Sequence, residues 1–373
     1  MDALMLPLNW QRVRLGDIGK PCMCKRVMKH QTTRYGEIPF YKIGTFGNTA
    51  DAFISKKLFL EYKTKYSFPK KGDILISASG TIGRAVIYDG KPAYFQDSNI
   101  VWIDNDETLV KNDFLFYAYS NVKWNTEHTT ILRLYNDNFR NTLIPLPPLN
   151  EQSAIANILS GLDRYLYALG ALILKKEGVK KALSFELLSQ RKRLKGFNQA
   201  WQRVRLGDIA NYLTSNLSVE QITQQGKIKV YDANNFIGYT DTTFISDKPY
   251  ISIIKDGSVG RVRILPPKTN ILSTMGALIA NHRTTTEFLF YLLSNFDFKN
   301  FTSGSIIPHI YFKDYKEKTI FLPPLNEQSA IANILSGLDN EIASLKNKKR
   351  QFENIKKALN HDLMSAKIRV LKK

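Results

Sequence analysis

LPPLNEQSAIANILSGLD, residues 146–163, occurs a second time without a single change at residues 322–339. A shorter identical pair precedes these copies, because WQRVRLGDI stands at residues 10–18 and again at residues 201–209. The chain therefore contains two copies of one unit: a Trp motif, a globular stretch, the LPPLNEQ motif and a long helical stretch. Such an internal repeat decides the architecture, because each copy is expected to fold in the same way.

The first residues of the longer repeat are typical of a helix start. Pro147 and Pro148 cannot continue a helix, but they can stand just before one. Asn150 can cap the helix, and Glu151 then lies in the first turn, where the helix dipole favours an acid. Beyond the start of the second copy, apolar residues recur every seven positions, at Ile331, Leu338, Leu345, Phe352 and Leu359.

Apolar residues at the same place in five consecutive heptads predict a coiled-coil seam. Each helix would run for about 40 residues, or about 60 Å at 1.5 Å per residue. We expect the two helices to pack on one another in antiparallel directions; an ordinary core helix is the alternative. Gly161, Gly170 and Gly178 each weaken the first helix by up to about 1 kcal/mol, so we expect it to bend or break near Gly178.

The two globular stretches carry the same landmarks in the same order. SGTIGR at residues 79–84 corresponds to DGSVGR at residues 256–261, and FLFY at residues 114–117 recurs at residues 288–291. The offset between the copies falls from 191 residues at the Trp motif to 176 at the LPPLNEQ motif, so the second stretch is 15 residues shorter. One fold with two divergent surfaces is the expected result.

These patterns predict an α/β (α+β) protein with a pseudo-two-fold internal repeat. Residues 1–148 and 196–324 are expected to form two mixed α/β domains. Residues 149–195 and 325–373 are expected to form the two long antiparallel helices that link them. In a two-fold arrangement the end of the second helix returns to the region of Trp10.

Composition indicates a basic protein. The net charge is +20 and 43% of the residues are hydrophobic. The excess of Lys and Arg is spread over every segment, which suits a protein that lies along a polyanion; a generic basic protein is the alternative. No run of 18 apolar residues predicts a membrane span, and MDALMLPLNW lacks the pattern of a signal peptide. With Cys22 and Cys24 as the two cysteines, we expect a reduced, cytoplasmic protein.

The repeated LPPLNEQ motif, the repeated WQRVRLGDI motif and the two glycine turns resemble the specificity subunits of type I restriction–modification systems, over the whole chain. The resemblance implies two target recognition domains that read the two halves of a split DNA site. The antiparallel helices would be a spacer that sets the gap between the half-sites.

The resemblance also implies an assembly on double-stranded DNA with two DNA adenine methyltransferase subunits and two motor-nuclease restriction subunits. This chain is then a non-catalytic subunit that binds no cofactor. S-adenosylmethionine would belong to the methyltransferase subunits, and ATP and Mg²⁺ to the restriction subunits.

Two other functions remain as alternatives. Asp51, Glu61 and Lys63 superficially match the acid and lysine pattern of a metal-dependent nuclease, although such short matches arise by chance. No two of the five histidines have metal-ligand spacing, and no phosphate-binding Gly-x-x-x-x-Gly-Lys motif is present. The second alternative is a basic DNA-binding scaffold without sequence preference.

Candidate DNA contacts lie in the glycine turns and the variable loops. The turn glycines either form hairpin turns, which we favour, or let the backbone approach a phosphate, and the turn arginines can contact DNA in both cases. The variable loops offer side chains with the donors and acceptors that read base edges. The full set is Lys42, Thr45, Asn48, Arg84, Gln96, Asn99, Asn234, Asn235, Arg261, Thr274, His282 and Arg283.

The identity of the long repeat extends to residues expected to be exposed, such as Gln152 and Ser153. We therefore interpret it as a surface that two identical partners recognise; the alternative is that it only holds the two halves together. The residues assigned to this surface are Glu151, Gln152, Ser153, Glu327, Gln328 and Ser329.

Overall fold

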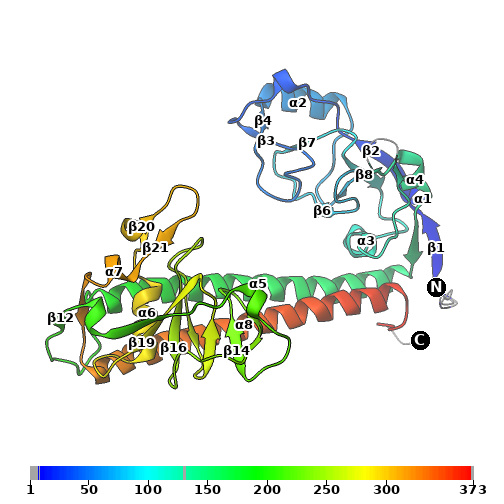
Figure 1. Cartoon of the computed structure of the whole chain (residues 1–373). Coiled ribbons are helices and arrows are strands. Elements are labelled where there is room, and N and C mark those ends of the chain that lie inside the picture. Colours follow the sequence, from blue (N-terminus) through cyan, green and yellow to red (C-terminus); the bar gives the residue numbers. More distant parts are fainter. Residues whose placement is uncertain (1–6, 8, 129–131, 371–373) are drawn as a thin grey trace. The chain divides into compact units, whose positions relative to one another are not determined.

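The computed structural model describes residue 7, residues 9–128 and residues 132–370. The chain divides into two compact units, Met1–Leu169 with Lys348–Lys373, and residues 170–347. Each unit holds one domain, with part of each long helix (Figure 1). The units are described separately below as unit 1 and unit 2.

The domain of unit 1 is built from short strands and short helices. Its elements in chain order are β1 (Gln11–Arg14), α1 (Leu15–Ile18), β2 (Gly19–Met23), η1 (Lys29–Gln31), β3 (Ile38–Tyr41), β4 (Phe53–Ile54), α2 (Lys56–Lys65), β5 (Ile74–Ser77), β6 (Ala85–Ile87), β7 (Tyr94–Phe95), β8 (Ile100–Asn105), α3 (Asn112–Tyr119), β9 (Glu127–His128), β10 (Leu132–Arg133), α4 (Asn136–Asn141) and β11 (Leu143–Leu146).

The domain of unit 2 follows the same order, except that among the described residues it has no counterpart of α2 and has one additional short 3-10 helix near its end. Its elements are β12 (Gln202–Arg205), η2 (Leu206–Asp208), β13 (Ala210–Thr214), η3 (Val219–Gln221), β14 (Ile228–Tyr231), β15 (Phe236–Thr240), β16 (Tyr250–Ile254), β17 (Val262–Leu265), β18 (Thr269–Ile271), β19 (Met275–Ala280), α6 (Thr286–Ser294), η4 (Lys299–Phe301), β20 (Thr302–Ser303), β21 (His309–Ile310), α7 (Phe312–Tyr315) and β22 (Thr319–Leu322).

Strand pairing is the same in the two domains. Each has a four-stranded sheet, in the order β2-β8-β5-β6 or β13-β19-β16-β17, and a three-stranded sheet, β4-β3-β7 or β15-β14-β18. The Trp-motif strand pairs with the strand before the LPPLNEQ motif, as β1 with β11 and β12 with β22, both antiparallel. A short hairpin, β9-β10 or β20-β21, completes each domain. This repetition confirms the predicted pair of mixed α/β domains.

Each domain is closed by a core that includes the long helices. In unit 1 the core joins Leu15 and Phe114 to Leu159 of the first long helix and Leu363 of the second. The fully buried strands, such as β5, carry apolar residues on both faces, because one face packs on the domain core and the other on the second sheet or a helix. In unit 2, α6 fills the place that α3 takes in unit 1.

The long helices are α5 (Leu149–Leu188) and α8 (Leu325–Met364), each 40 residues long. Within each unit they pack in antiparallel directions: Tyr165 meets Phe352 in unit 1 with ring centroids 4.8 Å apart, and Lys180 meets Asp339 in unit 2 at 2.5 Å. The prediction of two long antiparallel helices is confirmed. Among the described residues, no helix is long and apolar enough to cross a membrane.

The expectation that α5 breaks near Gly178 is wrong, because α5 is helical through this residue. Gly178 has no other atom within 4 Å of the position that a Cβ would take, so it lies on an open face of the helix. Flanking residues Ile173 and Leu187 are buried. Burial of such side chains contributes about 1.5–3 kcal/mol each, which outweighs the helix penalty of about 1 kcal/mol for one glycine.

The difference in length between the domains lies mainly around α2. Ser55 caps this helix by accepting a hydrogen bond from the Leu58 backbone N–H, and Phe59 anchors the helix on the core. In unit 2, residues 241–249 connect β15 directly to β16. The second domain therefore presents a different surface on the same frame.

Candidate nucleic-acid interface

The LPPLNEQ motif of unit 1 buries a carboxylate. Glu151 is 2% exposed, and its Oε2 accepts a hydrogen bond from Trp10 Nε1 at 3.0 Å. The guanidinium of Arg369 donates to both oxygens, at 2.6 and 2.8 Å. Hydrogen bonding to Glu151 is the main cause of the raised pKa of Arg369. The bidentate ion pair and the indole N–H together satisfy the buried carboxylate. Because Arg369 lies close to the C-terminal end, the contact also confirms that the segment after the second long helix returns to the region of Trp10.

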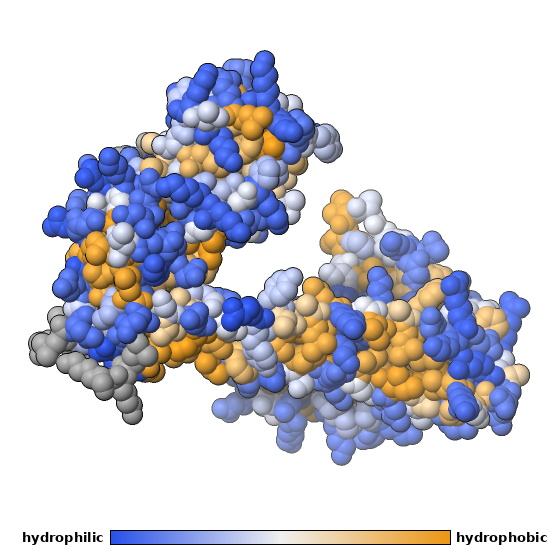
Figure 2. Space-filling view, turned by 180° about the vertical axis from the view of Figure 1, so that it is seen from behind, coloured by the Kyte–Doolittle hydropathy of each residue, from blue (hydrophilic) through white to orange (hydrophobic). Residues whose placement is uncertain are grey.

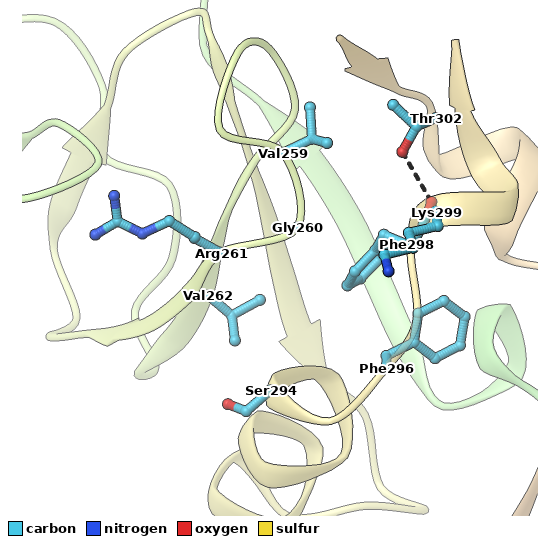
Figure 3. A pocket seen from close by; sticks show the side chains of 9 residues that line it. All are labelled: Val259, Gly260, Arg261, Val262, Ser294, Phe296, Phe298, Lys299 and Thr302. Carbon is cyan, nitrogen blue, oxygen red and sulfur yellow. Dashed lines mark hydrogen bonds between the residues drawn. The ribbon is translucent and has the colours of Figure 1, made fainter. Parts of the chain in front are cut away.

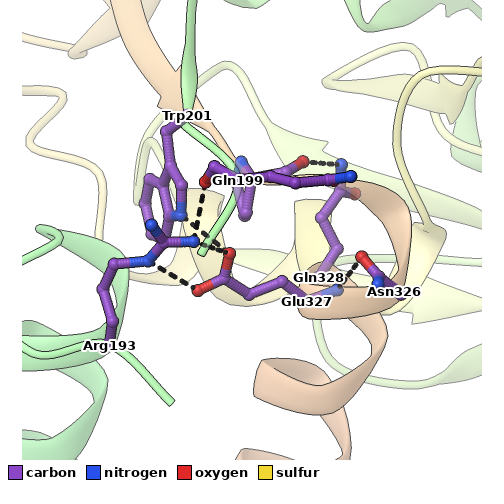
Figure 4. A network of polar contacts seen from close by, with 7 residues as sticks. Arg193, Gln199, Trp201, Asn326, Glu327 and Gln328 are labelled. Atoms are coloured by element: carbon purple, nitrogen blue, oxygen red, sulfur yellow. Dashed lines mark hydrogen bonds and ion pairs between the residues drawn. The ribbon is translucent and has the colours of Figure 1, made fainter. Parts of the chain in front are cut away.

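The motif of unit 2 repeats this arrangement (Figure 4). Glu327 is fully buried and accepts from Trp201 Nε1 at 3.0 Å. Arg193 donates to Glu327 through Nε at 3.2 Å and Nη2 at 2.6 Å, and Nη2 also donates to the Gln199 carbonyl at 2.8 Å. We call the Trp–Glu–Arg group of each unit the clamp.

The two clamp arginines were not identified from the sequence, although a signal for them exists. Arg193 and Arg369 stand at the same distance beyond the ends of α5 and α8, at the same offset as the motif copies. Gln190 and Ala366 turn the chain after each helix with φ of 61° and 56°, in the left-handed region that non-glycine residues rarely adopt. The matching turn directs each arginine back to a buried glutamate.

The glutamine of the motif is also buried. In unit 1, Gln152 Nε2 donates to the carbonyls of Leu109 and Pro147 at 2.9 and 2.8 Å, and its Oε1 accepts from the Lys111 N–H at 2.8 Å. These three bonds tie the start of α5 to the segment before α3. Full use of both ends of the amide explains why a polar side chain tolerates burial here.

Gln328 does the same in unit 2. Its Nε2 donates to the carbonyls of Arg283 and Pro323 at 2.9 and 2.8 Å. Its Oε1 accepts from the Thr284 hydroxyl at 2.8 Å and from the Thr285 N–H at 3.1 Å. The start of α8 is thereby tied to the segment before α6.

The last residue of the repeated motif joins the domain to the helix pair. Tyr117 donates to Asp163 at 2.8 Å, and Tyr291 donates to Asp339 at the same distance. Burial, followed by the hydrogen bond to the aspartate, raises the pKa of each tyrosine. Each phenol therefore stays protonated and remains a donor. Lys356 pairs with Asp163 in unit 1, as Lys180 pairs with Asp339 in unit 2.

These contacts show which residues of the motif are buried inside the chain. The expectation that Gln152 is exposed is wrong, because both its polar ends are used inside the chain. The same holds for the buried Glu151, Glu327 and Gln328. Ser153 and Ser329 are exposed, and their hydroxyls donate to the Leu149 and Leu325 carbonyls. Their role toward a partner stays a prediction.

The glycines of the two turns divide into two kinds. Gly83 and Gly260 have φ of 81° and 82°, and a Cβ at these positions would lie 2.0 Å from Trp124 Nε1 and 2.6 Å from the Phe298 ring. They are structural, because an aromatic ring packs on the bare backbone. Gly257 has a φ of 84° but no atom within 4 Å of a Cβ position, so an added side chain would have open space there.

The turn arginines contact the loop that follows β3 or β14. Arg261 Nη2 donates to Asn234 Oδ1 at 2.9 Å, and Arg263 Nη1 donates to the Asn234 carbonyl at 2.9 Å. Arg84 is exposed beside Gly47, where an added Cβ would lie 3.2 Å from its Nη2. The predicted arginines and the predicted loop residues of each domain are therefore neighbours.

In unit 1, several of the residues predicted to contact DNA bases accept hydrogen bonds from other groups of the same chain. Gln96 Oε1 accepts from the Ile43 N–H at 3.0 Å and Thr45 Oγ1 from the Lys42 N–H at 3.1 Å. Asn99 accepts from Ser79 and Arg133, both at 2.8 Å. These bonds shape the loop after β3, on which Asn48 is exposed and Lys42 pairs with Asp51 at 2.9 Å.

In unit 2 the predicted residues form two groups. The backbone N–H groups of Asn234 and Asn235 donate to Asp232 Oδ1 at 2.7 and 2.6 Å, which leaves the side chain of Asn235 exposed. Thr274 is exposed, and its carbonyl accepts from the Lys255 N–H, next to the DGSVGR turn.

His282 and Arg283 lie elsewhere in unit 2. Arg283 donates to Gln202 at 3.3 Å, and its carbonyl accepts from Gln328. The structure thus places these two predicted residues beside the clamp rather than beside the turn.

A hollow of about 460 Å³ opens next to the DGSVGR turn. Val259 and Val262 line one side, and Phe296 and Phe298 face them from the other (Figure 3). The guanidinium of Arg261 extends away from the two rings. The hollow therefore has a mixed lining, with Lys299 and Thr302 among its polar residues.

Cationic side chains are spread over the protein. Lys and Arg number 53 against 33 Asp and Glu, and Figure 2 shows hydrophilic side chains across both domains on the face drawn, with apolar side chains between them. Such a surface attracts a polyanion over a wide area and adds salt-dependent affinity.

The proposed nuclease residues have separate partners. Asp51 pairs with Lys42 at 2.9 Å and Glu61 with Lys65 at 3.1 Å, while the ammonium of Lys63 lies 5.3 Å from the centre of the Phe68 ring. Within the residues that the structure describes, no group of three His, Cys, Asp or Glu side chains could hold a metal ion. The structure gives this alternative no support.

Cys24 is a buried thiol rather than a reactive one. Its burial raises its pKa to about 12, and burial also raises the pKa of Cys22. Because the thiolate is the form that binds metals and attacks electrophiles, Cys24 stays protonated at neutral pH and acts as a packing residue.

The family model described as "Type I restriction modification DNA specificity domain" matches the chain over residues 7–176 and 198–354. A putative type I restriction enzyme specificity subunit of Haemophilus influenzae is 64% identical over 152 residues, which are 40% of this chain and 40% of the relative. The MjaVIII type I restriction enzyme specificity subunit of Methanocaldococcus jannaschii is 25% identical over 414 residues, with 99% of this chain and 95% of the relative covered.

Two solved structures share the fold. The crystal structure of a type I restriction–modification S subunit from M. genitalium has a TM-score of 0.64 at 20% identity, over 96% of this chain and 98% of that chain. A chain from a study of complex assembly and conformational transition in the type I system has a TM-score of 0.57 at 16% identity, with the same coverage.

Proposed function

This chain belongs to the family of type I restriction–modification DNA specificity subunits, and we propose that its two recognition domains read the two halves of a split, asymmetric DNA site. The observation that carries the proposal is one frame used twice with two different surfaces. The clamps coincide atom for atom in their pattern of hydrogen bonds, whereas the equivalent loops that the turn arginines contact, after β3 and after β14, differ in sequence and length. Different surfaces on equal frames suit two unequal half-sites.

The helix pair α5 and α8 is proposed to set the unread gap between the half-sites. Two-fold DNA readers place their half-sites about one turn, or ~34 Å, apart, and a 40-residue helix spans about 60 Å. In each unit the clamp and the Tyr–Asp bond anchor the domain to the helices. Adding or deleting one heptad in both helices is expected to change the gap and leave the half-site bases unchanged.

The helices also carry a repeated exposed stripe. Besides Ser153 and Ser329, the exposed positions shared by the two motif copies are Leu149, Asn150, Asn157 and Ile158, with Leu325, Asn326, Asn333 and Ile334. Internal packing does not explain identical residues at exposed places. The seam residues Leu345 and Phe352 are only partly buried by the helix pair. Both features support docking of two identical partners, which we propose are methyltransferase subunits.

The remaining assembly follows the same proposal. Two restriction subunits would bind through the methyltransferase subunits or the helix pair, and this chain would contribute recognition without catalysis. S-adenosylmethionine, ATP and Mg²⁺ would be bound by the partners.

The stripe is tested by replacing Ser153 and Ser329 together with tryptophan, and in a second variant Ile158 and Ile334 with aspartate. Each double variant is expected to lose the methyltransferase subunits on a sizing column and to keep its own fold by circular dichroism. A Lys176→Ala variant, on an exposed ion pair, is the control. Unchanged assembly of both double variants would contradict docking at the stripe.

The function itself is tested by the methylation pattern on a DNA library when this chain is co-expressed with its methyltransferase subunit. A split, asymmetric adenine-methylated motif with a fixed gap is expected. Replacing residues 19–144 by the equivalent segment of another family member should change one half of the motif only. Methylation without any motif would refute half-site reading.

A further inference from the structure

The tip of the β20–β21 hairpin exposes apolar side chains. Ile306 is 92% exposed and Ile307 is 55% exposed. Of the large apolar side chains that the structure describes, Ile306 is the most exposed. Single exposed apolar residues are normal on protein surfaces, but two adjacent isoleucines at one hairpin tip form a small exposed apolar patch, and such patches mark contact sites.

The hairpin is held rigidly against the DGSVGR turn. Its strands pair Thr302 with Ile310 and Ser303 with His309. The Gly257 N–H donates to the Pro308 carbonyl at 2.9 Å. These bonds fix both strands close to the tip, so Ile306 and Ile307 are presented by an ordered support.

Further contacts strengthen this junction. Asp256 lies 2.6 Å from His309 Nδ1, and the Ile310 N–H donates to the Lys255 carbonyl at 2.9 Å. Gly304 has a φ of 90°, and an added Cβ would lie 2.2 Å from the Ile307 carbonyl oxygen. Only glycine fits there, so the tight turn that presents Ile306 and Ile307 depends on Gly304.

The surroundings of the tip are basic. Residues 255–263 and 296–316, which form the turn and the hairpin with its flanks, contain six Lys and Arg against three Asp. Lys299 lines the hollow that adjoins Thr302, and the Lys313 ammonium lies 5.5 Å from the centre of the Tyr311 ring. An apolar point within a cationic surface fits a nucleic acid better than it fits an apolar protein face, since phosphates surround a stack of apolar bases.

We propose that Ile306 is a wedge that inserts between two neighbouring base pairs of the half-site read by the second domain, with Ile307 against the edge of the same step. DNA-binding proteins use exposed isoleucine, leucine or phenylalanine in this way, which partly unstacks and kinks the duplex. Pyrimidine–purine steps deform most easily. The wedge therefore selects a flexible step without a hydrogen bond to any base.

This inference rests on the proposed function, because it requires the second domain to contact a half-site. The test uses the complex of this chain with its methyltransferase subunits, bound to the duplex that the methylation pattern identifies. 2-Aminopurine is placed at successive positions across the second half-site and its flanks. The fluorescence of this base rises when it is unstacked. Because a methyltransferase also flips its target adenine out of the stack, that adenine is left unlabelled, and brightening at other positions reports insertion.

One position is expected to brighten on binding of the native complex. The Ile306→Ser variant should abolish this signal and weaken binding about tenfold or more, because the buried apolar contact is lost. Ile306→Leu keeps an apolar wedge and should keep the signal. Val219→Ser, which replaces an exposed apolar residue on η3, is the matched control and should bind as the native complex does.

The outcomes separate this inference from the proposed function. No brightening at any position, or unchanged binding by Ile306→Ser, overturns the wedge if the native complex still discriminates against a scrambled second half-site. Equal binding to the scrambled half-site overturns half-site reading itself, and the wedge with it. Loss of methyltransferase subunits from Ile306→Ser on a sizing column would show a protein contact and would also overturn the wedge.

Discussion

The two domains agree where they meet the long helices and differ where they face solvent around the glycine turns. At the clamps, Trp10 and Trp201 donate to their glutamates at the same distance of 3.0 Å. Around the turns, Arg261 bonds to Asn234, whereas Arg84 lies beside Gly47. The first domain also carries the helix α2, which has no counterpart among the described residues of the second domain. The comparison teaches that the frame is held by buried polar bonds, and that the surfaces are free to differ because the frame does not depend on them.

The largest expected effect comes from breaking one clamp. Glu327→Ala leaves Arg193 and the Trp201 N–H without their acceptor, and loss of one partner of a buried pair costs about 3–5 kcal/mol. Glu151→Ala should cost about as much, because Arg369 and Trp10 make the same contacts. Urea unfolding of the complex measures both.

Glu341→Ala is the matched control for the clamp variants. It removes an exposed ion pair with Lys176, and exposed pairs contribute about 0–1 kcal/mol. Equal losses of stability in Glu327→Ala and Glu341→Ala would contradict a structural role for the clamp.

The second prediction sharpens the comparison between the turn glycines. Gly260→Ala places a Cβ 2.6 Å from the Phe298 ring in a left-handed conformation that costs about 1–2 kcal/mol by itself. Gly257→Ala carries the conformational cost without the clash. Gly260→Ala is therefore expected to lower the free energy of unfolding more than Gly257→Ala does. The reverse order would contradict the structural assignment of Gly260.

The third prediction concerns the surfaces that differ. Arg84→Ala and Arg261→Ala are each expected to weaken DNA binding up to about tenfold, as the loss of a single DNA contact does. The measurement is the extent of methylation of duplexes in which one half-site has been altered. Each variant is expected to change how strongly methylation depends on the bases of the half-site that its own domain reads, and to leave the dependence on the other half-site unchanged. Identical effects on both halves would mean that the arginines contact the DNA without regard to domain.

The smallest expected effect is a gain of stability in the helix pair. Gly178→Ala should raise the free energy of unfolding by up to about 1 kcal/mol, because α5 is continuous there and the Cβ would enter open space. A small rise in the thermal midpoint checks this. A lower thermal midpoint would contradict this prediction, and would indicate that the folded helix needs glycine at this position.

Several features of the fold were predictable from the sequence because they are local or repeated. The Pro-Pro pair marks the helix start, and α5 and α8 begin directly after it at Leu149 and Leu325. The prediction that Asn150 caps the helix is wrong, because Asn150 lies within the first turn and the carbonyl of Pro148 accepts the first helical hydrogen bonds. The repeated turns required glycine because their backbone has positive φ, and Gly83 and Gly260 confirm the structural interpretation. The return of the chain to Trp10 followed from pseudo-symmetry.

Burial of the repeated polar residues could not be predicted, because it depends on segments far away along the chain. Helical spacing distinguishes the buried Gln152 from the exposed Ser153 only when the position of Leu109 and Pro147 is known. The clamp arginine Arg369 lies 218 residues from Glu151, and no local pattern connects the two. The identity of the two motif copies indicated that their residues have a common role, but not that several of these residues form hydrogen bonds inside the chain.

By itself, the sequence determined that this protein is one unit written twice, with two long helices and two different surfaces, because repetition and heptad periodicity are local properties of a chain. Only the tertiary structure decided which repeated residues face inward. A carboxylate such as Glu327 is stable inside the protein only where Arg193 and Trp201 converge on it, and that convergence is a property of the folded chain.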